Sequence, residues 1–261
     1  LNVTPDSFSD GGRYLDRDAA LRRAGEMTSA GADIIDVGGE STRPGARPVP
    51  ADEELARVLP VIEALAAQPG LVVSVDTRKA QVARAALEAG AAMVNDVSAM
   101  TGDPDMASVV AAYGAAVCLM HMRGTPETMQ NDPRYGDVVG EVAAYLAERV
   151  EAAVAAGIPR DRIFVDPGFG FGKTLDQNLE MLRRLREFAA LGCPVLVGTS
   201  RKSMLGALLG GLPPTDRTEG TAATVALAIA NGASVVRVHD VREMWRVVMV
   251  ADAVVRGARV P

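Results

Sequence analysis

The amino-acid sequence predicts an α/β protein, a (β/α)₈ TIM barrel in which eight parallel strands are surrounded by helices. Short β-branched apolar runs recur along the chain and are typical of a buried parallel sheet. Ala-rich amphipathic stretches separate them, and this alternation gives parallel strands joined by right-handed crossovers. The chain has 261 residues, the usual length of one such barrel. We therefore expect a single domain over residues 1–261.

Eight strand segments follow one another, and most are preceded by a glycine that suits the end of a helix. Residues 1–3 supply only the tail of the first strand, so we expect the start of that strand to be absent. The complete segments lie within residues 31–41, 70–79, 90–98, 114–122, 162–173, 193–202 and 232–240. The intervening helices are expected at residues 18–30, 51–66, 79–89, 105–113, 138–156, 175–191, 218–231 and 241–256. An open doubly wound sheet is the alternative, but the first turn lacks the Gly-rich nucleotide fingerprint of that fold.

Composition excludes several classes of function. The net charge is −6 and no basic run stands out, so we expect neither nucleic acid nor an anionic membrane as partner. No apolar stretch reaches the roughly 20 residues that a membrane helix needs. Cys118 and Cys193 lie in or beside apolar runs and are expected to be buried free thiols. The sequence thus predicts a soluble, cytoplasmic protein.

Polar residues follow the predicted strands at their carboxyl ends. In a barrel all these ends open on one face, where the chemistry takes place. The loops after the first two strands are long and rich in Gly, Pro and Ser, which makes them candidate lids. In chain order the strand ends carry Asn2, Asp6 and Asp10; Asp36, Glu40, Ser41, Thr42 and Arg43; Asp76, Thr77, Arg78 and Lys79; Asn95 and Asp96; His121 and Arg123; Asp166; Ser200, Arg201 and Lys202; and Arg237, His239 and Asp240.

An anion site is predicted after the last two strands, where barrels often bind phosphate. Arg201 and Lys202 follow one strand, and Arg237 and His239 follow the next. The loop after the first of these strands also begins a helix, whose free N–H groups favour anions. Ordinary surface salt bridges are the alternative for these side chains.

Asp76, Asn95 and Asp166 come directly after buried strands, where an ionised carboxylate needs a partner. A planar ligand edge with two adjacent N–H donors, such as a 2-amino-pyrimidinone, would supply one. The alternative is a ladder of Asp residues paired with Lys and Arg, and we favour that structural role for Asp36. With two histidines and no clustered cysteines a zinc site is not expected, whereas Mg²⁺ held mostly by ligand phosphates, with Asn2 as a ligand, is compatible.

The motifs at these strand ends closely resemble those of dihydropteroate synthases. The resemblance covers essentially the whole chain and keeps the motifs in order. They are LNVTPDSFSDGG (1–12), DVGGESTRPGA (36–46), VDTRKA (75–80), VNDVS (94–98), MHMRGTP (120–126), DPGFGFGK (166–173), GTSRKS (198–203) and RVHDV (237–241).

The resemblance assigns roles to individual positions. The pterin pocket would comprise Asp76, Asn95, Met120, Asp166, Phe171, Gly198 and Lys202. The diphosphate side would comprise Asn2, Thr42, Arg237 and His239, with Asn2 also contacting Mg²⁺. The aminobenzoate side would comprise Thr42, Arg43, Pro44 and Ser200. The catalytic set would be Asp76, Lys202, Arg237 and His239, with Asp10 on the first loop.

The same resemblance implies a folate-synthesis transferase, usually a homodimer and the target of sulfonamides. It would condense (7,8-dihydropterin-6-yl)methyl diphosphate with 4-aminobenzoate to give 7,8-dihydropteroate and diphosphate. The expected mechanism is a dissociative substitution with Mg-diphosphate as leaving group and no covalent enzyme intermediate. The alternatives are a pterin-dependent methyltransferase domain, which needs no diphosphate site, and a non-enzymatic pterin- or diphosphate-binding barrel.

Overall fold

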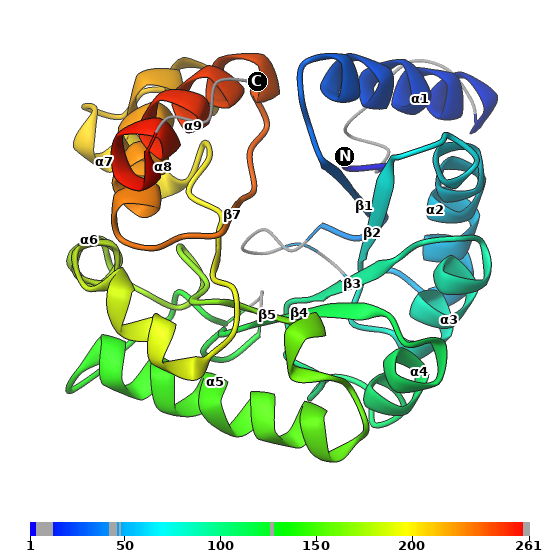
Figure 1. The fold of residues 1–261 in the computed structure, drawn as a ribbon, viewed down its shortest axis with the longest axis horizontal. Helices are drawn as coiled ribbons and strands as arrows, with labels where there is room; N and C mark the ends of the chain where they lie inside the picture. Colours follow the sequence, from blue (N-terminus) through cyan, green and yellow to red (C-terminus); the bar gives the residue numbers. More distant parts are fainter. Residues whose placement is uncertain (4–12, 42–45, 47, 126–127, 258–261) are drawn as a thin grey trace. The chain divides into compact units, whose positions relative to one another are not determined.

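The computed structural model describes residues 1–3, 13–41, 46, 48–125 and 128–257 (Figure 1). The chain divides into two compact units. The first comprises Leu1–Met120 and Arg149–Ile163, and the second comprises His121–Glu148 and Phe164–Pro261.

The first unit is built on parallel strands that alternate with helices. Strand β1 pairs with β2, β2 with β3 and β3 with β4, all in parallel. Asn2 forms a parallel bridge with Gly38 at the end of β1, so residues 1–3 lie where the tail of a first strand is expected. The elements of this unit are α1 (Arg13–Ser29), β1 (Ile34–Gly38), α2 (Ala51–Ala66), β2 (Val72–Asp76), α3 (Ala80–Glu88), β3 (Met93–Asp96), α4 (Met106–Tyr113), β4 (Ala116–Met120) and η2 (Arg160–Arg162).

The strands of the first unit are mainly apolar. Val37, Val75, Val94 and Val117 are fully buried. Helix α2 buries one apolar stripe and carries acidic residues in its first turn, where they suit the helix dipole. Strands β2 and β3 end on polar residues, whereas β1 ends on a glycine and β4 on a methionine.

The second unit continues the same pattern. Strand β5 is joined to β6 by the bridge between Val165 and Val195, and β6 pairs in parallel with β7. His121, just after β4, donates its backbone N–H to the carbonyl of Asp166 at 3.0 Å. The remaining elements are α5 (Val138–Ala155) and β5 (Ile163–Asp166), which both units share, and α6 (Leu175–Arg183), η3 (Leu185–Leu191), β6 (Leu196–Val197), α7 (Ser203–Leu208), η4 (Pro214–Asp216), α8 (Thr218–Ala230), β7 (Val235–Val236) and α9 (Val241–Arg256).

Most predicted elements are confirmed, with one helix divided. The stretch 175–191 is α6 followed by the 3₁₀ helix η3, because Leu185 and Phe188 are spaced by three residues and are both buried. Both cysteines are buried and form no disulfide, as expected. Among the described residues, no helix combines the length and apolar character needed to cross a membrane. The single domain stays a prediction.

Candidate active site

Asp76, Asn95 and Met120 end the neighbouring strands β2, β3 and β4 of the first unit. Asp76 lies in register with Gly38 on one side and with Asn95 on the other. Both polar side chains are only 7% exposed. The Asn95 amide donates from Nδ2 to Oδ2 of Asp36 at 2.9 Å, which fixes its orientation. The parallel register therefore brings a buried carboxylate and a buried amide to one edge of this sheet.

Two other carboxylates of these strands form hydrogen bonds within the fold. Asp36, in the middle of β1, accepts the Asn95 hydrogen bond, and its pairing with Lys and Arg stays a prediction. Asp96 is fully buried and accepts the backbone N–H groups of Ser98 at 2.7 Å and Met100 at 2.8 Å. Burial raises the pKa of Asp96, although those hydrogen bonds oppose the shift. Asp96 thus closes the turn after β3.

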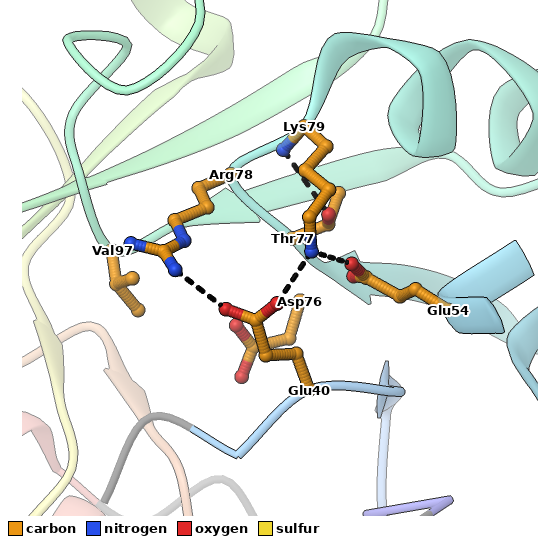
Figure 2. Close-up of a pocket in the computed structure, with 7 residues that line it drawn as sticks. All are labelled: Glu40, Glu54, Asp76, Thr77, Arg78, Lys79 and Val97. Atoms are coloured by element: carbon orange, nitrogen blue, oxygen red, sulfur yellow. Dashed lines mark hydrogen bonds and ion pairs between the residues drawn. The ribbon is translucent and has the colours of Figure 1, made fainter. Parts of the chain in front are cut away.

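A charged cluster of Glu40, Glu54, Arg78 and Lys79 lies beside Asp76 (Figure 2). Lys79 Nζ donates to Glu40 Oε2 at 2.5 Å and also to Glu54, while Arg78 Nη2 donates to Glu40 Oε1 at 2.8 Å. Burial alone would raise the pKa of Glu40, but bonds and charges from the two cations lower it overall. Arg78 and Lys79 are therefore committed to internal ion pairs.

We expect Lys79→Met to lower the free energy of unfolding by about 3 kcal/mol, because it leaves the fully buried Glu54 without its cation. Urea denaturation measures this change. Arg23→Met is the matched control, since Arg23 pairs with Glu26 on the surface and such pairs contribute less than about 1 kcal/mol. Equal losses in both variants would contradict the assignment.

In the second unit Asp166 ends β5 and is 8% exposed. Its Oδ1 accepts the backbone N–H of Gly168 at 2.7 Å. Burial raises the pKa of the Asp166 carboxyl, while that hydrogen bond and three nearby cations oppose the shift. The cations are Lys202, Lys173 and Arg237. A buried carboxylate surrounded by cations can stay ionised and accept hydrogen bonds from a ligand.

The two phenylalanines of the loop after β5 differ in environment. Phe169 is 1% exposed and packs in the core. Phe171 lies under Lys202, whose Nζ is 4.1 Å from the ring centroid. A Cβ at Gly170 would lie 3.3 Å from Cδ of Lys202, so the lysine stem passes close to this loop. Phe171 and Lys202 therefore present an aromatic face and a cation together, next to Asp166.

The predicted anion site has fewer available positive charges than the sequence suggested. Arg201 forms an ion pair with Asp240 through two hydrogen bonds, including one from Nε to Oδ2 at 3.0 Å. Arg201 therefore forms a salt bridge within the protein, which was the alternative to binding an anion. His239 Nδ1 lies 2.9 Å from the hydroxyl of Ser200. Burial and the charges of Arg237 and Arg201 lower the pKa of His239 to about 4. His239 is thus neutral at neutral pH and offers hydrogen bonds rather than charge.

Other predicted residues are placed as follows. Gly198 leaves space beside Arg237, since a Cβ built there would lie 3.9 Å from Arg237 Cβ. Asn2 is exposed next to Gly38. Asp10, Thr42, Arg43 and Pro44 lie outside the described residues.

Sequence reasoning missed Lys173, which is 3% exposed and contacts His121. The available signal was compositional: lysine occurs only at positions 79, 173 and 202, and each follows a strand-end motif.

The chain matches known proteins along nearly its whole length. Residues 1–239 match the family model described as "Pterin binding enzyme". The dihydropteroate synthase of Synechocystis sp. is 49% identical over 256 residues, covering 98% of this chain and 89% of the relative. This chain belongs to the dihydropteroate synthase family.

Solved dihydropteroate synthase structures also match the fold. The Yersinia pestis enzyme in complex with a sulfonamide drug superposes with a TM-score of 0.93 and 46% identity over 99% of this chain and 93% of that one. The Xanthomonas albilineans enzyme with 4-aminobenzoic acid superposes with a TM-score of 0.91 and is 48% identical in sequence. The match covers 97% of this chain and 90% of that one. The (β/α)₈ fold class predicted from the sequence is thus confirmed, and the methyltransferase alternative is not favoured.

Proposed function

We propose that the chain catalyses the condensation of (7,8-dihydropterin-6-yl)methyl diphosphate with 4-aminobenzoate to 7,8-dihydropteroate and diphosphate, a step of folate synthesis. The observation that carries the proposal is Asp166, a buried carboxylate held by Gly168 and surrounded by the charges of lysines and an arginine. Such a group suits the paired N–H donors of an aminopyrimidinone ring. Membership of the dihydropteroate synthase family supports the same ligand.

Asp166 and Phe171 offer two groups that suit a pterin ring. Asp166 accepts hydrogen bonds from the amino-pyrimidinone edge, and the ring of Phe171 offers an aromatic face. The family resemblance also assigns the buried carboxylate of Asp76 and the buried amide of Asn95 to the pterin. Met120, Gly198 and Lys202 complete the proposed pterin-binding set.

In the proposed dissociative reaction the C–O bond to the diphosphate breaks first, and the arylamine then attacks the exocyclic methylene carbon. The bonding electrons leave with the diphosphate, and the amine loses a proton after the C–N bond forms. Anionic Asp76 and Asp166 favour the positive charge that spreads over the pterin ring. Holding the amine against that carbon supplies much of the rate. Ser200 and the residues Thr42, Arg43 and Pro44 would hold the aminobenzoate, with Asp10 on the first loop.

The diphosphate would be held by Asn2, Thr42, Arg237 and His239. Arg237 supplies positive charge, and His239 can donate from Nε2 in the tautomer whose Nδ1 accepts from the Ser200 hydroxyl. Binding of the anion is expected to raise the pKa of His239 above its value of about 4 in the free protein.

Mg²⁺ fits this donor set only as an ion held mostly by diphosphate oxygens. The described residues contain no group of three His, Cys, Asp or Glu side chains that could hold a metal. Asn2 is exposed and would add an amide oxygen. The ion, when bound, neutralises charge on the leaving group.

The proposal is tested by mixing the protein with the pterin diphosphate, 4-aminobenzoate and Mg²⁺ and measuring diphosphate release. We expect release and dihydropteroate in equal amounts, and neither without enzyme. Release without dihydropteroate, or no release at all, would contradict the proposed condensation.

We also propose a homodimer formed through helices α8 and α9. Leu227, Trp245, Val250 and Val254 are between 45% and 81% exposed on these helices, and such an apolar surface is typical of an interface. Ala226, Val247 and Val250 line a groove on the same surface.

Val250→Lys combined with Val254→Lys is expected to convert the dimer to a monomer, because each protomer would bury two ammonium groups in the interface. Light scattering during size exclusion measures the mass. Val154→Lys is the matched control: Val154 is 36% exposed on α5, a helix that is not part of the proposed α8–α9 interface, and the substitution should leave the dimer intact. A wild-type monomer would contradict the proposal.

Two further properties belong to this proposed function. Sulfonamides are expected to compete with aminobenzoate, as suggested by the drug complex of the Yersinia pestis relative. The two buried cysteines form no disulfide, which fits a reducing compartment, so we propose that the reaction takes place in the cytoplasm.

A further inference from the structure

The loop Gly168–Gly172, which joins β5 to α6, carries Phe171 and orients Asp166. Its three glycines have φ angles of +73°, +77° and +64°, a region that side chains rarely adopt. Asp166 Oδ1 accepts the N–H of Gly168. The positions of Phe171 and of the Asp166 carboxylate therefore depend on the conformation of this loop.

Lys173 holds the loop through hydrogen bonds to the loop's backbone carbonyls. Its Nζ donates to the carbonyls of Gly168 and Phe171, both at 3.0 Å, and lies 2.9 Å from Nδ1 of His121. The lysine is 3% exposed. Each of these acceptors is uncharged, so the three donors of the ammonium group are used on the loop and on the imidazole.

His121 is the third acceptor, and its chemistry fits that role. An ammonium group can only donate, so Nδ1 must accept and the ring proton must lie on Nε2. Burial and the charges of Lys173 and Arg123 lower the pKa of His121 to about 3, which keeps it neutral. The ring of Tyr145 packs against it edge-on at 5.0 Å. The acceptor geometry is thus maintained over the ordinary pH range.

The charged groups that act on Lys173 are Asp166, which favours the ammonium form, and Lys202, which opposes it. Burial, the largest effect, lowers the pKa of Lys173 to about 7. Tyr135, which stacks under Arg123, donates to the carbonyl of Gly172 at 2.9 Å, and burial raises its pKa. Lys173 is therefore expected to change charge near neutral pH.

We propose that Lys173 is a positioning residue, whose buried ammonium group fixes the loop Gly168–Gly172 and thereby holds Phe171 and the Asp166 carboxylate in place for the pterin ring. Loss of the ammonium proton removes one of its three donated hydrogen bonds and a positive charge near Asp166. This inference rests on the proposed pterin site and adds a buried residue that positions the groups of that site.

The first test measures the affinity of Lys173→Met for two separate probes, 6-hydroxymethylpterin and inorganic diphosphate. We expect pterin affinity to fall about tenfold or more and diphosphate affinity to change less than about twofold. Arg184→Met is the matched control: Arg184 joins Asp137, Glu180 and Glu187 in the same unit, so its loss lowers stability without touching the loop.

Equal losses for both probes, or unchanged pterin affinity, would overturn the positioning role. If the wild-type protein itself binds no pterin, it is the proposed function that fails, and the two failures are therefore distinguishable.

The second test uses the wild-type chain, so it does not depend on folding of a variant. Lysine labelled with ¹³C at Cε gives signals from only three positions, 79, 173 and 202. We expect the Lys173 signal to titrate near pH 7 and pterin affinity to fall in step as the pH rises through this value. A Lys173 signal that does not titrate, or pterin affinity that does not follow it, would overturn the proposal.

Discussion

Asp76→Asn is expected to lower the rate of dihydropteroate formation by about 10³-fold or more. The substitution keeps the size of a side chain that is 7% exposed at the end of β2, removes its charge and replaces one acceptor oxygen with an NH₂ donor. A charge that favours the cationic pterin acts mainly in the transition state, so turnover should fall much more than pterin affinity. Steady-state diphosphate release and calorimetric titration with 6-hydroxymethylpterin measure the two effects.

Asp96→Asn is the matched control for this prediction. Asp96 is another buried carboxylate at a strand end, but it accepts hydrogen bonds from Ser98 and Met100 within its own turn. Its variant should lose thermal stability while the folded fraction keeps most of its turnover. If Asp76→Asn retained more than about a tenth of wild-type turnover, the catalytic role of Asp76 would be wrong.

Arg237→Ala should weaken binding of the pterin diphosphate by about 30- to 100-fold, while binding of 6-hydroxymethylpterin changes far less. Arg237 follows β7, and a guanidinium group donates charge-assisted hydrogen bonds that contribute about 1.5–3 kcal/mol each. Titration calorimetry with both ligands gives the ratio of the two losses.

Arg201→Ala separates this local effect from general loss of positive charge. Arg201 is already paired with Asp240, so its removal should affect the two ligands equally and weakly. Equal losses for both ligands in Arg237→Ala would contradict the assignment of Arg237 to the diphosphate.

The local pattern of apolar and polar residues was sufficient to predict the alternation of strands and helices. Helices α2 and α9 have the predicted bounds 51–66 and 241–256. The same pattern predicted Asp76, Asn95 and Asp166 at the carboxyl ends of strands, and the structure has them in the last two residues of β2, β3 and β5. The motifs then identified the family, since they extend along the whole chain.

Only the tertiary structure decided which side chains pair with one another and which titratable side chains are charged. Lys79 pairs with Glu40 and Glu54 rather than with the aspartates of the predicted ladder. The sequence could not predict this choice, because it contains many carboxylates that could have been the partner. Lys173 and His121 are 52 residues apart and meet only after folding. Their charges depend on burial, which desolvates an ion by an amount set by every element packed around it. Residue order along the chain therefore predicted which groups reach the site, whereas the packed environment decided which of them carry charge there.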